Sequence, residues 1–328
     1  MPEIAVITGA SAGVGRATAR EFARRGCGIA LLARGRDGLE ATAREVDELG
    51  GEALIIPTDV ADHEAVDRAA DLAASHFGRI DIWVNNAFAG LFSRFVDASP
   101  EEYRRVTDVT YFGQVHGTRA ALRHMLPRDA GAIVLVGSAL AFRGIPLQSA
   151  YCAAKHALQG FQDSLRAELI DARSQVRLAM VQLPGVNTPQ FDWVRAHVAG
   201  RPRPVGAVYE PEVAARAIWK AAHSPRKQWI VGAPAYQAIW GDKLLSPLLD
   251  LYLGRTSVAA QQGPEPAARN GAGNLFEPVA GDHGAHGRFG DKARARSPLL
   301  WASEHRHWLA AGTALAVGAS MAVRRRKT

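Results

Sequence analysis

A glycine-rich turn near the N-terminus limits most strongly how this chain can fold. The turn, TGASAGVG, spans Thr8–Gly15; it follows the apolar run Ile4–Ile7 and opens a helical stretch, Arg16–Arg25. Strand, tight turn and helix in this order are the first unit of a sheet with parallel strands. Glycines let the backbone approach a pyrophosphate, and the helix N-terminus offers unpaired N–H groups and positive potential. The turn predicts a dinucleotide site, although a glycine-rich turn alone is a weak signal.

Short apolar runs alternate with amphipathic stretches as far as residue 231. Such runs predict strands, and stretches such as 38–49 and 64–76 predict the helices between them. This alternation indicates an α/β fold, a doubly wound parallel sheet of about seven strands with helices on both faces. The predicted strands are Ile4–Thr8, Gly28–Ala33, Ala53–Pro57, Ile80–Val84, Ala132–Val136, Val176–Val181 and Gln228–Val231.

Three polar residues in the middle of the chain point to proton-transfer chemistry. Ser138 follows a predicted strand, and Tyr151 and Lys155 lie four residues apart in a helical stretch, so their side chains share a face. A phenol has a pKa of about 10, and a nearby ammonium lowers it by favouring the phenolate. Tyr151 can then exchange a proton with a carbonyl or alcohol oxygen that Ser138 holds. A lone Tyr-x-x-x-Lys is usually ordinary helix surface; Ser138 and the glycine turn favour a site.

Together these motifs resemble the short-chain dehydrogenase/reductase family, from about residue 3 to residue 231. The turn fits its TGxxxGxG, Asn85-Asn86-Ala87 the start of its NNAG, Tyr151 and Lys155 its YxxxK, and Pro184-Gly185 followed by Thr188 its PG motif. The resemblance implies a Rossmann-type fold and carbonyl/alcohol interconversion by hydride transfer. In this scheme Tyr151 is the proton donor or acceptor and Lys155 also binds the ribose. It further implies a small-molecule substrate and a homo-oligomer.

The chain departs from the family pattern at two positions. Phe88 stands where NNAG has glycine, and Thr110, in the stretch Asp108–Gly113, stands where the family usually has a catalytic Asn. That Asn helps to hold a water in a proton relay, so Thr110 is the candidate to replace it. The expected catalytic residues are Ser138, Tyr151, Lys155 and Thr110.

The end of the second predicted strand indicates the cofactor. An acidic residue there would bind the ribose 2′-hydroxyl of NAD, but Ala33 takes that position and Arg34 follows. A guanidinium pairs well with a 2′-phosphate, so NADP is expected and NAD is the alternative. Asp59 and Val60 are expected at the adenine, or Asp59 caps the next helix. The expected cofactor-binding residues are Gly9, Ser11, Gly13, Val14, Gly15, Arg34, Asp59, Val60, Asn86, Tyr151, Lys155, Pro184, Gly185 and Thr188.

Charge and cysteine content exclude some classes of protein. The formal net charge is +7, but ten Lys and Arg against five Asp and Glu lie from Thr256 onward, so the main domain has no basic face for nucleic acid. Two cysteines make no disulfide framework, and nothing before Ile4 resembles a signal peptide. A cytoplasmic location is therefore expected. His283 and His286 lie near Asp282 in a glycine-rich segment, where solvated loop residues are expected and no metal.

The composition changes near Thr256, which predicts three units. Residues 1–255 form the catalytic domain, 256–298 a glycine-rich linker or loosely packed extension, and 299–328 an apolar helix with a basic flank. The uncharged stretch Trp308–Val323 is slightly short for a bilayer span. Two interpretations stay open: contact with the cytoplasmic face of a membrane, or a surface helix or tail.

Two further questions stay open at this stage. The aromatic residues Phe191, Trp193 and Tyr209 indicate either a bulky, apolar substrate or ordinary core packing. The leading hypothesis for function is an NADP-dependent oxidoreductase. The alternative is a non-catalytic NADP-binding scaffold or redox sensor recruited to a membrane, which Thr110 favours and the intact Ser138, Tyr151 and Lys155 disfavour.

Overall fold

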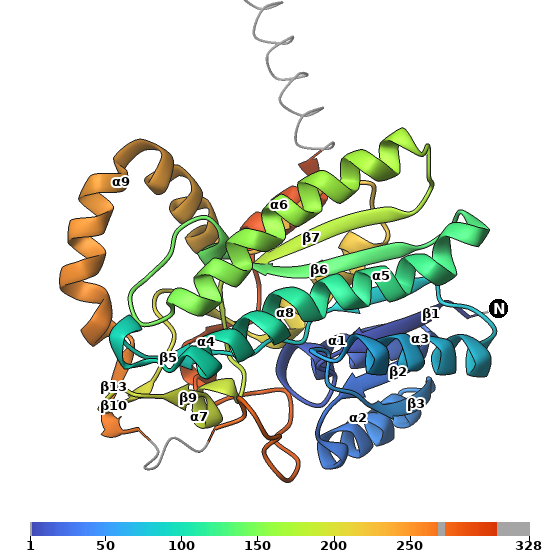
Figure 1. The fold of residues 1–328 in the computed structure, drawn as a ribbon, viewed down its shortest axis with the longest axis horizontal. Coiled ribbons are helices and arrows are strands. Elements are labelled where there is room, and N and C mark those ends of the chain that lie inside the picture. Colours follow the sequence, from blue (N-terminus) through green and yellow to red (C-terminus); the bar gives the residue numbers. More distant parts are fainter. Residues whose placement is uncertain (1, 268–272, 307–328) are drawn as a thin grey trace, which may run out of the picture.

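The computed structural model describes residues 2–267 and 273–306. Its central sheet has seven strands in the order β12-β7-β6-β4-β1-β2-β3, and all neighbouring strands are parallel (Figure 1). These strands are β1 (Ile4–Thr8), β2 (Gly28–Ala33), β3 (Glu52–Pro57), β4 (Ile82–Asn85), β6 (Ala132–Ser138), β7 (Arg177–Leu183) and β12 (Gln228–Ile230). The predicted α/β fold is confirmed, and each expected strand is present with bounds that differ by at most two residues.

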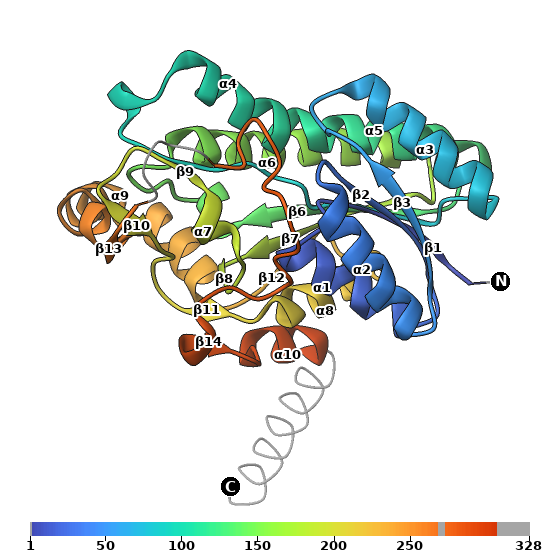
Figure 2. The same ribbon diagram turned by 90° about the horizontal axis from the view of Figure 1, so that it is seen from below.

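Helices cover both faces of this sheet (Figure 2). One face carries α1 (Gly13–Ala23), α2 (Arg36–Glu48), α8 (Pro211–Ala222) and the short α10 (Pro298–Glu304). The other carries α3 (His63–Phe77), α4 (Pro100–Thr107), α5 (Gly113–Met125) and α6 (Ser149–Asp171). A π-helical turn, η2 (Asp108–Phe112), joins α4 to α5. The short elements between them are β5 (Leu91–Phe92), η1 (Phe95–Asp97), η3 (Leu126–Arg128), η4 (Ala139–Ala141), β8 (Gly185–Val186), α7 (Gln190–Trp193), β9 (Arg195–Ala196), β10 (Gly200–Pro202), β11 (Val208–Tyr209), β13 (Gln262–Pro266), η6 (Gly290–Lys292) and β14 (Ala293–Arg294).

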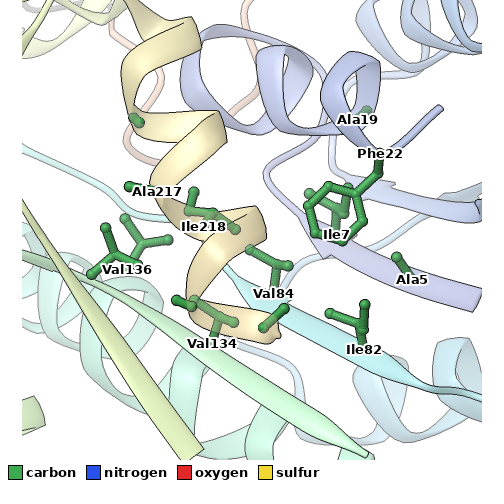
Figure 3. Packing of buried hydrophobic residues seen from close by; sticks show 14 of the residues in the cluster. Ala5, Ile7, Ala19, Phe22, Ile82, Val84, Val134, Val136, Ala217 and Ile218 are labelled. Carbon is green, nitrogen blue, oxygen red and sulfur yellow. The ribbon is translucent and has the colours of Figure 1, made fainter. Parts of the chain in front are cut away.

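Two hydrophobic cores separate the sheet from its helical layers. Successive side chains of a strand point to opposite faces, so Ile7 of β1 joins the core under α1 and α8, whereas Val6 joins the other. In Figure 3, Phe22 of α1 lies beside Ile7 of β1, and Ile218 of α8 lies beside Val84 of β4. Burying one such large apolar side chain stabilises the fold by about 1.5–3 kcal/mol. Burial on both faces therefore fixes each strand's register and, with it, the positions of the strand ends.

A long helix, α9 (Ala233–Ala260), follows the sheet, and the sequence analysis did not predict it. It is kinked: Leu245 has φ −137° and Pro247 lies inside the helix, where proline removes a hydrogen bond and clashes with the preceding turn. The helix continues past the boundary expected at residue 255. In the segment beyond it, Leu275 and Ala285 are 0% and 4% exposed, whereas most of the other described residues are exposed. The division into units at 255 and 298 stays a prediction.

The membrane hypothesis rested on 308–323, which lies outside the described residues. Within 2–267 and 273–306, none of the helices combines the length and the apolar character that a bilayer crossing needs.

Candidate active site

A cavity of about 580 Å³ opens at the carboxyl edge of the sheet, where β1, β2, β4 and β6 end. Ligands of open α/β sheets bind at this edge. All predicted site residues except Gly15 and Thr110 line the cavity. The fold therefore brings together residues that are far apart along the chain, and their roles stay predictions.

The glycine turn forms one wall, and its geometry suits a phosphate. Helix α1 has no side-chain N-cap and no acidic residue in its first turn, and Ala12, Gly13 and Val14 at its start line the cavity. The positive potential of this helix N-terminus therefore reaches the cavity. Gly15 packs too closely for a side chain, since an added Cβ would lie 2.1 Å from the Gly9 carbonyl oxygen. Asn86 braces the turn: its Nδ2 donates to the carbonyl oxygens of Thr8 at 3.0 Å and Gly9 at 3.3 Å.

The proton-transfer residues come from β6 and α6. Ser138 is the last residue of β6, and Tyr151 and Lys155 lie in the first two turns of α6. Lys155 is 2% exposed; its Nζ donates to the Val136 carbonyl oxygen at 2.6 Å and lies 5.6 Å from the centre of the Tyr151 ring. The strand end and the helix start thus place a hydroxyl, a phenol and an amine around one part of the cavity.

The acidities of these groups differ from the sequence-based expectation. Burial raises the pKa of Tyr151 to about 12, although a side-chain hydrogen bond with Ser138 acts in the opposite direction. Tyr151 is half-buried and borders the cavity. Burial also lowers the pKa of Lys155 to about 7. The expected lowering of the phenol pKa by a nearby ammonium is therefore wrong for this structure, because desolvation is the larger effect.

Comparison with known proteins identifies the family. The family model described as short chain dehydrogenase matches residues 3–198. This chain belongs to the short-chain dehydrogenase family. Membership makes it an NAD(P)-dependent oxidoreductase.

Relatives of this short-chain dehydrogenase are found in bacteria and animals. The uncharacterized oxidoreductase YxnA of Bacillus subtilis is 33% identical over 283 residues, 86% of this chain and 80% of that protein. Human dehydrogenase/reductase SDR family member 7 is 38% identical over 167 residues, 50% of this chain and 49% of that protein. Among solved structures, an alcohol dehydrogenase from Thermococcus sibiricus complexed with 5-hydroxy-NADP has a TM-score of 0.59 and 27% identity, covering 70% of this chain and 96% of its own.

The two departures from the family pattern have different structural roles. Phe88 borders the cavity and packs edge-on against Tyr151, with ring centres 5.9 Å apart. Thr110 lies in η2, is fully buried and is not part of the cavity wall. Its hydroxyl donates to the Ala89 carbonyl oxygen and accepts from the Ala89 N–H, both at 3.0 Å. A hydroxyl has a single donor, so its proton is engaged by the loop after β4. The catalytic role expected for Thr110 stays a prediction.

We expect Thr110→Val to destabilise the fold and slow turnover. Valine leaves the N–H and C=O of buried Ala89 without this partner, at about 1–3 kcal/mol for each unsatisfied group, and frees the loop that carries Phe88. Urea unfolding and steady-state kinetics measure the two effects. Thr110→Ser, which keeps the hydroxyl, is the matched control and should retain wild-type rates. Equal stability of Thr110→Val and wild type would contradict the bracing role.

Arg34 and Asp59 line the cavity, but both also have protein partners. The Nη1 of Arg34 donates to the carbonyl oxygens of Phe276 at 2.6 Å and Leu275 at 3.3 Å, and its Nη2 donates to that of Asn274. Asp59 pairs with Arg105. The alternative role of Asp59 as a helix cap does not hold, because Asp62 caps α3.

Part of the cavity wall is apolar, and the contribution of one helix to it was missed from the sequence. Phe191 and Trp193 line the cavity, as a site for an apolar substrate would require. Tyr209 is buried in a hydrophobic core, as ordinary packing would require. Helix α9 adds Leu249, Tyr252 and Leu253. No amphipathic period marks α9 in the sequence, because its kink breaks the pattern.

Arg143 holds α9 against the site, and it too was missed. Its Nη1 donates to Asp242 at 2.8 Å, its Nη2 pairs with Asp250, and these two acids flank the kink. Arg143 lies just after η4, in the loop that follows Ser138. Its two ion pairs therefore attach both halves of the kinked helix to this loop.

The histidines near Asp282 have separate environments. His283 packs on the Trp193 ring at 4.4 Å, while His286 pairs with Glu212 at 3.0 Å. Glu210, Glu212 and His286 offer ligand atoms within 4.8 Å of one another, but His286 is exposed and its ion pairs account for this grouping.

Proposed function

We propose that this short-chain dehydrogenase interconverts a carbonyl and an alcohol with NADP as cofactor and Tyr151 as the proton donor or acceptor. The observation that carries the proposal is one continuous cavity that joins Arg34 and the glycine turn to Ser138, Tyr151 and Lys155. A dinucleotide needs a cationic end, a pyrophosphate cradle and a reactive end in this order. The NADP complexes among similar solved structures support the choice of cofactor.

The bound cofactor supplies the hydride, and the side chains bind the substrate oxygen and transfer its proton. Ser138 holds the oxygen by a hydrogen bond. Because the pKa of Tyr151 is about 12, the phenol is protonated at neutral pH and has a proton to give to a developing alkoxide. Lys155, buried beside the ring, orients the phenol and faces the ribose. This protonation state favours carbonyl reduction at neutral pH and alcohol oxidation at higher pH.

The cavity wall indicates the substrate class. Phe88, Phe191 and the α9 residues Leu249 and Leu253 surround the space beyond Tyr151. Ligand pockets of this composition bury most of an apolar ligand and orient it through few polar groups. We infer a bulky, apolar ketone or aldehyde, with Ser138 and Tyr151 as the polar contacts.

Turnover assays test the proposal. Aliphatic and aromatic ketones and aldehydes of increasing size should be reduced with NADPH, and the larger apolar compounds should have the lower KM. Short, charged carbonyl compounds serve as controls and should react poorly. Binding of NADPH without turnover of any compound would contradict the enzyme proposal and favour a nucleotide-binding scaffold or sensor.

We expect Arg34→Ala to weaken NADPH binding about 10- to 100-fold more than NADH binding, the equivalent of one or two charge-assisted hydrogen bonds. Titration of each cofactor into wild type and variant measures the ratio. Arg36→Ala is the matched control, because Arg36 is exposed and pairs with Glu40 at 2.7 Å. The substitution also removes the hydrogen bonds from Arg34 to residues 274–276, but this loss should weaken the binding of both cofactors alike. An unchanged ratio of NADPH affinity to NADH affinity would therefore contradict the role of Arg34 in cofactor choice.

A further inference from the structure

One segment of the C-terminal extension, residues 274–287, crosses the carboxyl edge of the sheet; we call it the strap. Leu275 near its start is buried in the core shared with α3–α6. Ala285 near its end is buried between Ala17 of α1 and Ala215 of α8. The strap thus passes from one helical layer to the other and is anchored by an apolar side chain in each. In Figure 2 this red-orange segment runs past the sheet toward β14 and α10.

Between these anchors, the strap bonds to the elements that we assign to the cofactor. The Gly13 N–H donates to the Gly284 carbonyl oxygen at 3.1 Å, and the Gly281 N–H donates to Asp37 of α2 at 2.8 Å. At the other end, Arg34 and Arg105 both donate to the Leu275 carbonyl oxygen, at 3.3 and 3.0 Å. The strap is therefore attached at the glycine turn and at the end of β2.

An ion pair strengthens the attachment. Arg16 of α1 is 4% exposed; it binds both oxygens of Glu45 at 2.9 Å and also pairs with Asp282 of the strap. Hydrogen bonds from Arg16 hold the pKa of Asp282 below its ordinary value, so Asp282 is charged at neutral pH. Arg16 lies one turn into the helix whose N-terminus faces the cavity, so this pair ties the strap directly to the predicted pyrophosphate site.

The cavity continues beneath the strap. Asn274, Pro278, Val279, Gly281 and His283 line the same space as Ser11, Gly13 and Arg34. The strap therefore forms a part of the cavity wall that adjoins the glycine turn. Although Gly13 gives its N–H to the strap, the first turn of α1 has further N–H groups that no helical carbonyl pairs, and these serve a pyrophosphate in the enclosed space.

We propose that the strap is part of the cofactor site: it closes over the adenosine half of NADP, and the dinucleotide leaves only when the strap detaches from Arg16. This inference rests on the proposed function. An enclosing segment slows release more than it changes the contacts themselves, and opening of such segments often limits turnover. Among the contacts of the strap, the pair between Arg16 and Asp282 can be removed without changing a proposed cofactor-binding side chain, and we expect its loss to weaken the attachment of the strap.

Asp282→Asn tests the proposal, with Asp291→Asn as the matched control. Asp291 is an exposed acid of the same extension, in η6 and outside the cavity wall. Protein loaded with NADPH is mixed with excess NADP⁺, and the loss of nicotinamide fluorescence gives the dissociation rate. We expect Asp282→Asn to release NADPH about tenfold faster, the equivalent of ~1.4 kcal/mol, and Asp291→Asn to match wild type. Hydrogen exchange of wild type is a second measurement: NADPH should protect the amides of Gly281 and Gly284.

The outcomes separate the two proposals. Equal dissociation rates in wild type and Asp282→Asn, with no added amide protection, would overturn the strap proposal and leave the proposed function intact. Tighter NADPH binding by Asp282→Asn would overturn it too, since the strap would then compete with the cofactor. Failure of wild type to bind NADPH would overturn the proposed function and the strap proposal with it.

Discussion

Replacing Tyr151 by phenylalanine is expected to lower turnover by about 10²–10⁴-fold, the usual contribution of a general acid, while NADPH binding stays largely intact. The ring contacts should persist, because Phe88 packs against the ring edge and the Lys155 Nζ lies 5.6 Å from the ring centre. Only the hydroxyl is lost. Its pKa of about 12 makes it a proton donor over the whole neutral range, and no phenylalanine atom can replace it.

Steady-state kinetics with NADPH and a reducible carbonyl compound, together with a fluorescence titration of NADPH, measure both effects. Tyr111→Phe is the matched control: Tyr111 lies in η2, packs against Phe112 with ring centres 5.0 Å apart and is not among the residues that line the cavity. In wild type, oxidation of the alcohol should accelerate as pH rises, because it needs the phenolate. A Tyr151→Phe enzyme at near wild-type rate would show that the proton comes from another group.

Lys155→Met is expected to abolish most turnover and weaken NADPH binding, yet make the fold more stable at neutral and acidic pH. Burial lowers the pKa of Lys155 to about 7, below its value of about 10.4 in an unfolded chain. Between these values the unfolded state binds one proton more, so the wild-type free energy of unfolding rises with pH by about 1.4 kcal/mol per unit. Below pH 7 the wild type carries the full cost of a buried ammonium, which methionine lacks.

The methionine substitution should leave no buried polar group without a hydrogen-bond partner. The Val136 carbonyl oxygen, which accepts from Lys155, also accepts from Gln114 at 3.2 Å, so it keeps a partner. Urea unfolding at pH 6 and pH 9 should show the variant more stable at the lower pH and the difference shrinking at the higher. Lys220→Met on the exposed side of α8 is the control. A pH-independent difference would mean that Lys155 stays charged in the folded protein.

The expected effects of Tyr151→Phe and Lys155→Met do not depend on the strap. They can therefore be tested separately from the strap proposal. Tyr151 and Lys155 line the cavity beside Ser138, where we propose that the nicotinamide binds, whereas Asp282 pairs with Arg16 of α1 and is not among the residues that line the cavity. Asp282→Asn should change cofactor release and leave the proton donor unaltered. The pH dependence of alcohol oxidation should therefore be the same in Asp282→Asn and wild type.

The fold and most of the site could be predicted from the sequence because both depend on local patterns. Apolar runs of strand length, such as Ile4–Thr8 and Gly28–Ala33, became buried parallel strands with the same bounds. The carboxyl ends of such strands share one edge. Ser138, Tyr151 and the glycine turn therefore meet there, although they are far apart in the chain.

Other features depend on contacts that leave little trace in side-chain identity. The strap is held largely by backbone carbonyls, such as those of Leu275 and Gly284, and every residue type has such a group. Thr110 was assigned to the chemistry because of its position in the motif, but its partner is the backbone of Ala89. The pKa of Tyr151 rises because neighbouring segments exclude water, which a spacing of four residues cannot reveal.

The sequence by itself determined the parallel sheet, the glycine turn and the group formed by Ser138, Tyr151 and Lys155, because hydrophobic periodicity and residue chemistry act over short distances along the chain. Only the tertiary structure decided that α9 lines the cavity, that the Thr110 hydroxyl bonds to the backbone of Ala89, and that part of the strap borders the same cavity. These depend on which surfaces meet after folding, since desolvation and backbone hydrogen bonding arise between segments that no sequence period connects.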